Sequence, residues 1–301
     1  MRAVDGVSFA LREGETLGLV GESGSGKTTV CLSLLRLLPP AARIVGGEVR
    51  FEGEDLLRKT DGEMRRIRGK RIAMILQDPM VSLNPLFTIA DQVGEPLRVH
   101  EGASRKAATQ RVRDLLAQVR IPAPEARMRD YPHQMSGGMR QRIVGAIAIS
   151  CRPRLLLADE PTTSLDLTIQ AQYLNLLKDL QRQHGLAMIF VTHNLGIVAK
   201  ICDQVAVMYA GKLAEYGPVR QIFNAPAHPY TQALLESIPR VADRRARLTA
   251  IDGQPPDLAA LPPGCPFQPR CPKAEPRCAR EEPPAFPVGD GHVARCWLRE
   301  R

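Results

Sequence analysis

A glycine-rich loop between a short apolar run and a stretch of helical character constrains this chain most. It matches the pattern G-x-x-x-x-G-K-[ST] with the residues Gly21-Glu22-Ser23-Gly24-Ser25-Gly26-Lys27-Thr28. The apolar run at 16–20 predicts a strand, and residues 28–38 predict a helix that stops at Pro39-Pro40. A strand, a loop and a helix in this order form a phosphate-binding unit, so the sequence predicts an α/β fold.

Further apolar runs predict that this unit belongs to a larger sheet. Runs typical of buried parallel strands occur at 72–76, 155–158, 187–191 and 205–209. Apolar residues at helical spacing within 112–119 and 169–180 predict two amphipathic helices, the first capped by Ser104. Strands that alternate with helices indicate a three-layer α/β core. Residues 86 to about 150 contain no convincing strand and are predicted to form a helical subdomain.

The glycine-rich loop predicts a nucleotide as its ligand. Backbone N–H groups of such a turn converge on phosphate oxygens, and the dipole of the following helix adds to the attraction. Lys27 is expected to reach the β- and γ-phosphates, and Thr28 to offer its hydroxyl to Mg²⁺. The residues predicted to bind ATP here are Gly21, Glu22, Ser23, Gly24, Ser25, Gly26, Lys27, Thr28 and Thr29.

Two carboxylates end the apolar run that begins at Leu155. An acidic residue at the tip of a buried strand is well placed to bind Mg²⁺ beside a phosphate loop, so Asp159 is predicted to have this role. Glu160 is then predicted to act as the general base that positions the attacking water. A strand that simply ends at a charged surface is the alternative, and the neighbouring motifs weigh against it.

Charge and composition exclude several other classes of protein. The formal net charge is +9, and the densest basic run, 65–71, has no interleaved aromatic residues on which nucleic-acid bases could stack. We therefore interpret this run as a solvated face and expect no nucleic-acid partner. No apolar run reaches the roughly 18 residues that a membrane span requires, and no signal-peptide pattern begins the sequence, which predicts a cytosolic protein.

Several more motifs follow in a characteristic order and resemble those of the ATPase subunits of ATP-binding-cassette (ABC) transporters. These are Gln77 after a strand, the loop Ser136-Gly137-Gly138, the segment Ser164-Leu165-Asp166, and His193, which lies 33 residues after Glu160. The resemblance covers nearly all of residues 1–225, predicted to be the ATP-binding domain. It implies a RecA-like core with an antiparallel β subdomain and the helical subdomain already described.

The resemblance also implies a mechanism and a dimer. Two such subunits would enclose two ATP molecules head to tail, with Ser136, Gly137 and Gly138 reaching the ATP bound by the opposite subunit. Gln77 would contact the metal and the water and relay closure to the membrane subunit. Asp166 would cross the dimer interface, and His193 would hold the γ-phosphate.

The sequences of three segments resemble those of one branch of this family, the dipeptide, oligopeptide and nickel importers. They are Gln77-Asp78-Pro79-Met80-Val81-Ser82-Leu83-Asn84-Pro85, Tyr131-Pro132-His133-Gln134-Met135-Ser136-Gly137-Gly138-Met139 and His228-Pro229-Tyr230-Thr231-Gln232-Ala233-Leu234. The branch implies an ATPase that drives peptide import from the cytoplasmic side of the inner membrane. Its partners would be membrane permease subunits, a second ATPase subunit that is a paralogue or an identical copy, and indirectly a substrate-binding protein. Import of nickel or another small solute, and a soluble ABC ATPase without a transport role, are the alternatives.

One expected feature of the family does not match this sequence. Family members usually carry, upstream of residues 3–8, a strand with an aromatic residue that stacks on adenine. The printed sequence begins too late to supply it, and Phe9 is expected to pack in the sheet instead. Either the start is truncated or other groups hold the adenine, in which case weak ATP binding is expected.

Four cysteines crowd the proline-rich segment 226–301, which is predicted to be a separate C-terminal extension. Cys265, Cys271, Cys278 and Cys296 do not have the paired C-x₂-C spacing of a zinc ribbon. Four thiolates in a loop-rich segment can nevertheless bind a [4Fe–4S] cluster or Zn²⁺. The segment resembles the C-terminal extension of peptide-importer ATPases, some of which hold a [4Fe–4S] cluster. We therefore predict a cluster, with zinc or no metal as alternatives.

Overall fold

The strands expected from the apolar runs lie side by side in one sheet. A computed structural model describes residues 1–163, 165–238 and 251–300 of the chain. Its main sheet has eight strands in the order β4-β5-β6-β1-β7-β8-β10-β9. The strands are β1 (Thr16–Val20), β4 (Ile72–Ile75), β5 (Leu155–Asp159), β6 (Ala187–Val191), β7 (Gln204–Tyr209), β8 (Lys212–Pro218), β9 (Phe286–Gly289) and β10 (His292–Ala294). The five strands predicted from sequence are confirmed, and all five run parallel.

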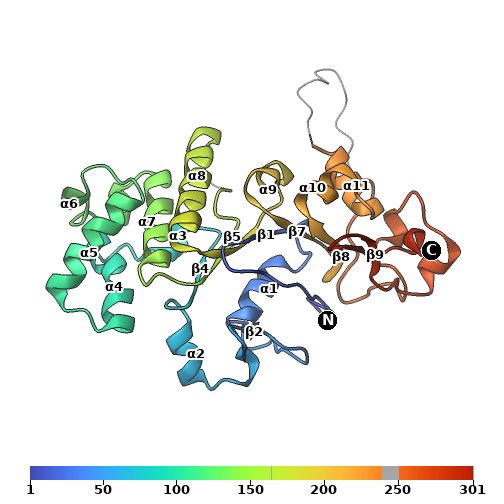
Figure 1. Cartoon of the computed structure of the whole chain (residues 1–301), viewed down its shortest axis with the longest axis horizontal. Coiled ribbons are helices and arrows are strands. Elements are labelled where there is room, and N and C mark those ends of the chain that lie inside the picture. The colour runs from blue at the N-terminus through green and yellow to red at the C-terminus, as the bar shows by residue number, and fades with distance from the viewer. Residues whose placement is uncertain (164, 239–250, 301) are drawn as a thin grey trace.

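Helices cover both faces of the sheet, which confirms the predicted layers. In Figure 1, α8 and α9 lie on one side of the strands and α1 on the other. The helices are α1 (Lys27–Leu34), α2 (Asp61–Ile67), α3 (Pro79–Ser82), α4 (Ile89–Glu101), α5 (Arg105–Gln118), α6 (Pro124–Arg127), α7 (Gly137–Ile149), α8 (Leu167–His184), α9 (Leu195–Ile201), α10 (Val219–Asn224) and α11 (Pro229–Glu236). The predicted cap of α5 is present, since Ser104 Oγ accepts a hydrogen bond from the Ala107 N–H at 3.3 Å.

The helix after the phosphate loop ends earlier than the sequence predicts. It ends at Leu34 rather than at residue 38, because Arg36 adopts a left-handed conformation with φ of 53°. The N–H of Arg36 bonds to the Ser33 carbonyl, and that of Leu37 to the Leu32 carbonyl. These two bonds close the helix at Leu34, five positions before Pro39, the first of the prolines that were expected to stop it.

Residues 86–150 form helices α4 to α7, which gather at one end of the molecule (Figure 1). Their apolar residues share one hydrophobic core with the sheet strands β4, β5 and β6 and with α8. A short antiparallel pair, β2 (Arg50–Phe51) and β3 (Glu54–Asp55), lies on the side of α1. The helical part is therefore attached to the sheet through packing as well as through the chain.

The C-terminal extension joins the main sheet. Strand β10 pairs antiparallel with β8, through Val293 opposite Tyr216 and Ala294 opposite Glu215, and β9 pairs with β10. Glu215 is fully buried and bonds to His292 Nε2 at 2.6 Å. The sheet therefore continues across the boundary near 225 that composition predicts. That boundary stays a prediction about the organisation of the chain.

Candidate functional site

The glycine-rich loop connects β1 to α1 in a backbone conformation that requires glycine. Gly24 and Gly26 have φ of +77° and +97°, and Gly26 is the residue that precedes α1. A Cβ atom at Gly26 would lie 2.5 Å from the Ala3 carbonyl oxygen, and one at Gly21 would lie 2.1 Å from the Met208 carbonyl oxygen. Close approach of neighbouring backbone thus excludes side chains at both positions.

Lys27 lies beneath this loop. Its Nζ donates hydrogen bonds to the carbonyl oxygens of Gly21 and Glu22, both at 2.8 Å. Burial lowers the pKa of the Lys27 ammonium, although the nearby carboxylates of Glu160, Asp159 and Glu22 oppose that shift. Among the other predicted ATP-binding residues, Ser25 is buried, Thr29 is half-buried, and Ser23 and Thr28 are exposed.

Asp159 and Glu160 lie at the end of β5, close to the phosphate loop. Asp159 is buried, and burial raises the pKa of its carboxyl, while hydrogen bonding to Thr28 and the charge of Lys27 act in the opposite direction. Glu160 adopts a left-handed conformation with φ of 44°, and its N–H bonds to the Val191 carbonyl at 3.0 Å. Such a backbone conformation is costly for a residue with a side chain and is concentrated at functional sites.

The carboxylate of Glu160 brings together residues that are far apart in the sequence. Gln77 Nε2 donates to Glu160 Oε2 at 3.2 Å, and the Thr163 hydroxyl donates to the same oxygen at 2.9 Å. His193 Nδ1 lies 3.4 Å from Glu160 Oε1. Gln77 and His193, both predicted from motifs, therefore meet at the carboxylate of Glu160, just beyond the end of β5.

The loop Ser136-Gly137-Gly138 lies elsewhere, at the beginning of α7. Ser136 and Gly137 are exposed, and Ser136 Oγ caps α7 by accepting the Met139 N–H at 3.3 Å. Figure 1 shows α7 at the helical end of the molecule and α1 near the middle. The structure therefore does not bring this loop to the phosphate loop of the same chain.

Asp166 and Gly138 both contact the start of α8. The Asp166 carboxylate accepts the N–H groups of Thr168 and Ile169, each at 3.0 Å, and so caps the helix. A Cβ atom at Gly138 would lie 2.7 Å from Ile169 Cγ2. Ser164, part of the same motif as Asp166, lies outside the described residues.

The four cysteines of the extension line one cavity. Cys265, Cys271, Cys278 and Cys296 surround a space of about 300 Å³, together with Phe267 and Trp297 among others. Each carries a free thiol, and burial raises the pKa of Cys265 to about 11. Within residues 1–163, 165–238 and 251–300, no group of three or more His, Cys, Asp or Glu side chains is close enough to hold a metal ion.

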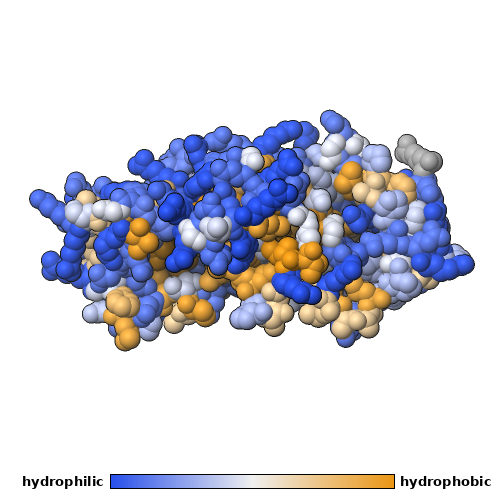
Figure 2. Space-filling view, turned by 90° about the horizontal axis from the view of Figure 1, so that it is seen from below, coloured by the Kyte–Doolittle hydropathy of each residue, from blue (hydrophilic) through white to orange (hydrophobic). Residues whose placement is uncertain are grey.

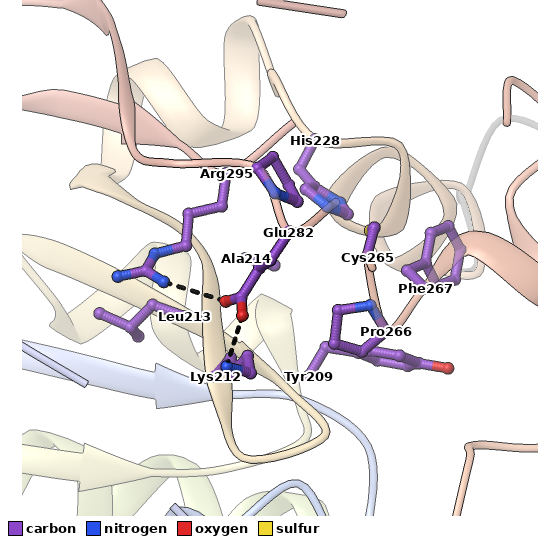
Figure 3. Close-up of a pocket in the computed structure, with 11 residues that line it drawn as sticks. Tyr209, Lys212, Leu213, Ala214, His228, Cys265, Pro266, Phe267, Glu282 and Arg295 are labelled. Carbon is purple, nitrogen blue, oxygen red and sulfur yellow. Dashed lines mark hydrogen bonds and ion pairs between the residues drawn. The ribbon is translucent and has the colours of Figure 1, made fainter. Parts of the chain in front are cut away.

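A second pocket lies where the extension packs against β8. It has a volume of about 310 Å³ and is lined by Cys265, Phe267 and other residues shown in Figure 3. Glu282 closes it by pairing with Lys212 at 2.8 Å and with Arg295 at 3.3 Å. The pair with Lys212 holds the extension to β8, and the pair with Arg295 lies within the extension.

The sequence did not indicate that the extension also touches the phosphate loop. Arg270 pairs with the carboxylate of Glu22, and the Tyr230 hydroxyl accepts the Glu22 N–H at 2.9 Å. Tyr230 belongs to a segment that was noted only for its resemblance to the peptide importers. A contact between residues 248 positions apart leaves no local pattern, so a single sequence offers no signal for it.

Comparison with known proteins identifies the family. The family model described as ABC transporter matches residues 4–163. The chain is 52% identical to the dipeptide transport ATP-binding protein DppD of Bacillus subtilis, and the alignment covers 100% of this chain and 90% of that protein. The chain belongs to the ABC transporter family. It is thus an ATPase of the cassette type, and a second model, described as oligopeptide/dipeptide transporter, C-terminal region, matches residues 214–278.

Other ABC proteins are similar to this ATPase in sequence and in fold. The oligopeptide transport ATP-binding protein OppD of Bacillus subtilis is 49% identical, over 99% of this chain and 84% of that protein. The solved ATP-binding cassette MJ0796, a dimer bound to ADP and Pi, superposes with a TM-score of 0.64 at 29% identity, over 72% of this chain and 91% of that one. The ABC cassette fold with its mixed sheet is therefore confirmed for the ATPase.

Proposed function

We propose that this ATPase powers the import of di- or oligopeptides through partner permease subunits in the membrane. The observation that carries the proposal is the match of residues 214–278 to the C-terminal region of oligopeptide and dipeptide transporters. Relatives named as dipeptide and oligopeptide transport proteins, at 46–52% identity along almost the whole chain, support it. No helix of the described residues is long and apolar enough to cross a membrane. The ATPase would act as a peripheral subunit on the cytoplasmic side of the membrane, where ATP is available to it.

The contacts at the end of β5 support the catalytic roles proposed for these residues. Glu160 would act as general base, because its carboxylate is half-buried, fixed by Gln77 and Thr163, and directed toward His193. His193, whose side chain is 62% exposed, would turn to the γ-phosphate. Thr28, Asp159 and Gln77 would hold Mg²⁺, which supplies charge neutralisation to the phosphates when it is bound.

A second ATPase subunit would complete each nucleotide site. Ser136, Gly137 and Asp166 are exposed, and Ser136 lies at the start of a helix whose N–H groups attract phosphate. Because this loop is remote from the phosphate loop of its own chain, the ATP that it contacts would belong to a partner cassette. The partner would be a paralogue or a second copy, and ATP would draw the two subunits together.

The permease would dock beside Gln77. Large apolar side chains follow this residue on the surface, with exposed fractions of 56% for Met80, 79% for Val81, 80% for Leu86 and 53% for Phe87. Figure 2 shows that hydrophobic groups on the lower face lie among a mostly hydrophilic surface. Exposed apolar residues concentrated in one short segment are typical of an interaction site. Movement of Gln77 would relay nucleotide occupancy to the permease.

The four cysteines would hold a [4Fe–4S] cluster. The support is that all four thiols line one cavity and that none is tied in a disulfide. A zinc ion draws its sulfur ligands to about 2.3 Å and so needs them close together. A [4Fe–4S] cluster takes four cysteine thiolates as its ligands, the number that this cavity offers. The thiols would lose their protons on binding, and the cluster would have a structural or regulatory role.

The test of the transport proposal is reconstitution with the permease subunits and the partner ATPase in lipid vesicles. A peptide-loaded binding protein should stimulate ATP hydrolysis and drive uptake of a labelled dipeptide or oligopeptide. The same complex with Glu160→Gln should show neither. Stimulation by nickel with no response to peptides of two to six residues would overturn the assignment. Iron, sulfide and zinc per chain after anaerobic purification test the cluster, and absence of iron would remove it.

A further inference from the structure

Arg270, in the C-terminal extension, uses every one of its hydrogen-bond donors. Its Nη1 donates to Glu22 Oε2 at 2.7 Å and to the Tyr209 hydroxyl at 3.2 Å. Its Nη2 donates to Glu22 Oε1 at 3.0 Å and to the Ile251 carbonyl at 3.2 Å, and its Nε to the Asp252 carbonyl at 2.9 Å. A guanidinium has five N–H groups, and all five are engaged here. Its position is therefore strongly determined.

The residue that Arg270 holds is part of the phosphate loop. Glu22 is fixed at three points: its carboxylate by Arg270, its N–H by the Tyr230 hydroxyl at 2.9 Å, and its carbonyl by Lys27 Nζ at 2.8 Å. Two of these three partners lie beyond residue 225. The shape of the loop thus depends on the extension as well as on the strand and helix that flank it.

The pair is placed where its charge matters. The Arg270 side chain is only 4% exposed and the Glu22 side chain 27%, so solvent screens the pair weakly. The Arg270 guanidinium also lies 5.8 Å from the centre of the Tyr209 ring and 6.0 Å from that of Phe267. A carboxylate in a loop that binds a triphosphate would repel the ligand. The two parallel bonds from Arg270 neutralise that carboxylate and turn it toward the extension.

We propose that Arg270 is a positioning residue for ATP binding, which acts by holding and neutralising Glu22 of the phosphate loop. The proposal rests on the function proposed above only in taking ATP as the ligand of the loop. It assigns to the C-terminal extension a direct part in setting ATP affinity. Cys271, the next residue in the chain, lines the four-cysteine cavity. Arg270 therefore connects that cavity to the nucleotide site.

The test compares ATP affinity and steady-state kinetics in the full-length chain. Arg270→Lys retains the charge but loses the paired geometry, and should raise the Kd for Mg-ATP and the KM about fivefold or more with kcat changed less than twofold. Arg270→Gln should bind Mg-ATP more weakly still, because no positive charge then neutralises the Glu22 carboxylate. The matched control is Arg277→Gln: Arg277 lies in the same extension, pairs with Glu281 and Glu300, and should leave the Kd within twofold.

A double variant separates this role from a purely structural one. Adding Glu22→Gln to Arg270→Gln removes the unneutralised carboxylate and should recover at least part of the lost affinity. Unchanged affinity in Arg270→Lys and Arg270→Gln, or a double variant no better than Arg270→Gln alone, would overturn the proposal. If the Arg270 variants fail to fold, Tyr209→Phe removes one acceptor of Arg270 without touching the loop. It should raise the Kd two- to fourfold, and an unchanged Kd would be equally decisive. Failure of the wild-type chain to bind ATP would instead count against the proposed function.

Discussion

Gln77 and Glu160, 83 positions apart, are joined by a hydrogen bond of 3.2 Å from Gln77 Nε2 to Glu160 Oε2. The bond links the segment with the exposed apolar residues to the proposed general base. Glu160 itself has a left-handed backbone, held by the bond from its N–H to Val191. A change in the position of the Gln77 side chain therefore changes the position of the Glu160 carboxylate, and the reverse.

Replacing Glu160 with glutamine should separate ATP binding from hydrolysis. The variant keeps the shape of the side chain, but one acceptor oxygen becomes an NH₂ donor and the side chain cannot take a proton from the attacking water, so kcat should fall about 100-fold or more. The Kd for Mg-ATP should stay within a few-fold, and an ATP-bound dimer should accumulate with a suitable partner. Turnover assays measure the loss of kcat, and size-exclusion chromatography in the presence of ATP measures the dimer. Glu125→Gln, on the exposed surface of α6, is the control, and equal turnover in the two variants would refute the role of Glu160.

Alanine substitutions at Gly26 and Gly24 should differ in their cost to stability. Both glycines have positive φ, so each alanine variant should lose about 1 kcal/mol in the free energy of unfolding from backbone strain alone. At Gly26 the new Cβ would also lie 2.5 Å from the Ala3 carbonyl oxygen, whereas at Gly24 it meets no atom within 4 Å. The free energy of unfolding of the nucleotide-free protein, measured in urea, should therefore fall clearly more in Gly26→Ala than in Gly24→Ala. Equal losses would contradict the backbone approach described here.

Gly138 and Gly137 offer a similar comparison at the start of α7. Gly138→Ala should cost about 1–3 kcal/mol in unfolding free energy, because its Cβ would lie 2.7 Å from Ile169 Cγ2. Gly137→Ala meets no atom within 4 Å and should be neutral or slightly stabilising. Adding Ile169→Ala to Gly138→Ala should cost less than the sum of the two single changes. Strict additivity would show that the two positions are not in contact.

The stability of the ATPase should fall as the pH drops below about 6.5. Burial lowers the pKa of His228 from 6.5 to about 4, and its Nδ1 accepts the Tyr230 N–H at 3.0 Å. Between these values the unfolded chain binds a proton that the folded chain does not, so stability is complete above pH 6.5 and is lost progressively toward pH 4. The full difference is about 3 kcal/mol. His228→Asn keeps a capping acceptor without titrating, and its unfolding midpoint should vary less between pH 7 and 5.

The fold could be predicted where the signal was local. Each parallel strand is a short apolar run, because it is buried on both faces. The same holds for the loop at 21–28, whose glycines are required by its own backbone conformation. The end of α1 was predicted wrongly from the prolines at 39 and 40. The left-handed backbone of Arg36 and the hydrogen bonds around it end this helix at Leu34 instead.

Contacts between distant segments could not be predicted. The motifs named Gln77, Glu160 and His193 as candidates, but only the structure shows that they meet at one carboxylate. Strand β10 is three residues long and lies in a proline-rich segment, so no periodicity marks it. The pairing of Arg270 with Glu22 joins a 3₁₀ turn, Gln268–Arg270, to the phosphate loop, and neither segment has a pattern that points to the other.

The pairing of β10 with β8 limits how far this protein can be reduced. A minimal fragment ending at residue 225 would leave β8 with an unpaired row of N–H and C=O groups and would uncover the carboxylate of Glu215. Exposed edges of this kind recruit strands from other molecules. Such a fragment is expected to self-associate, so its nucleotide affinity would describe an aggregate-prone remnant. The smallest unit in which this ATPase can be studied as a well-behaved particle includes the segment that completes its sheet.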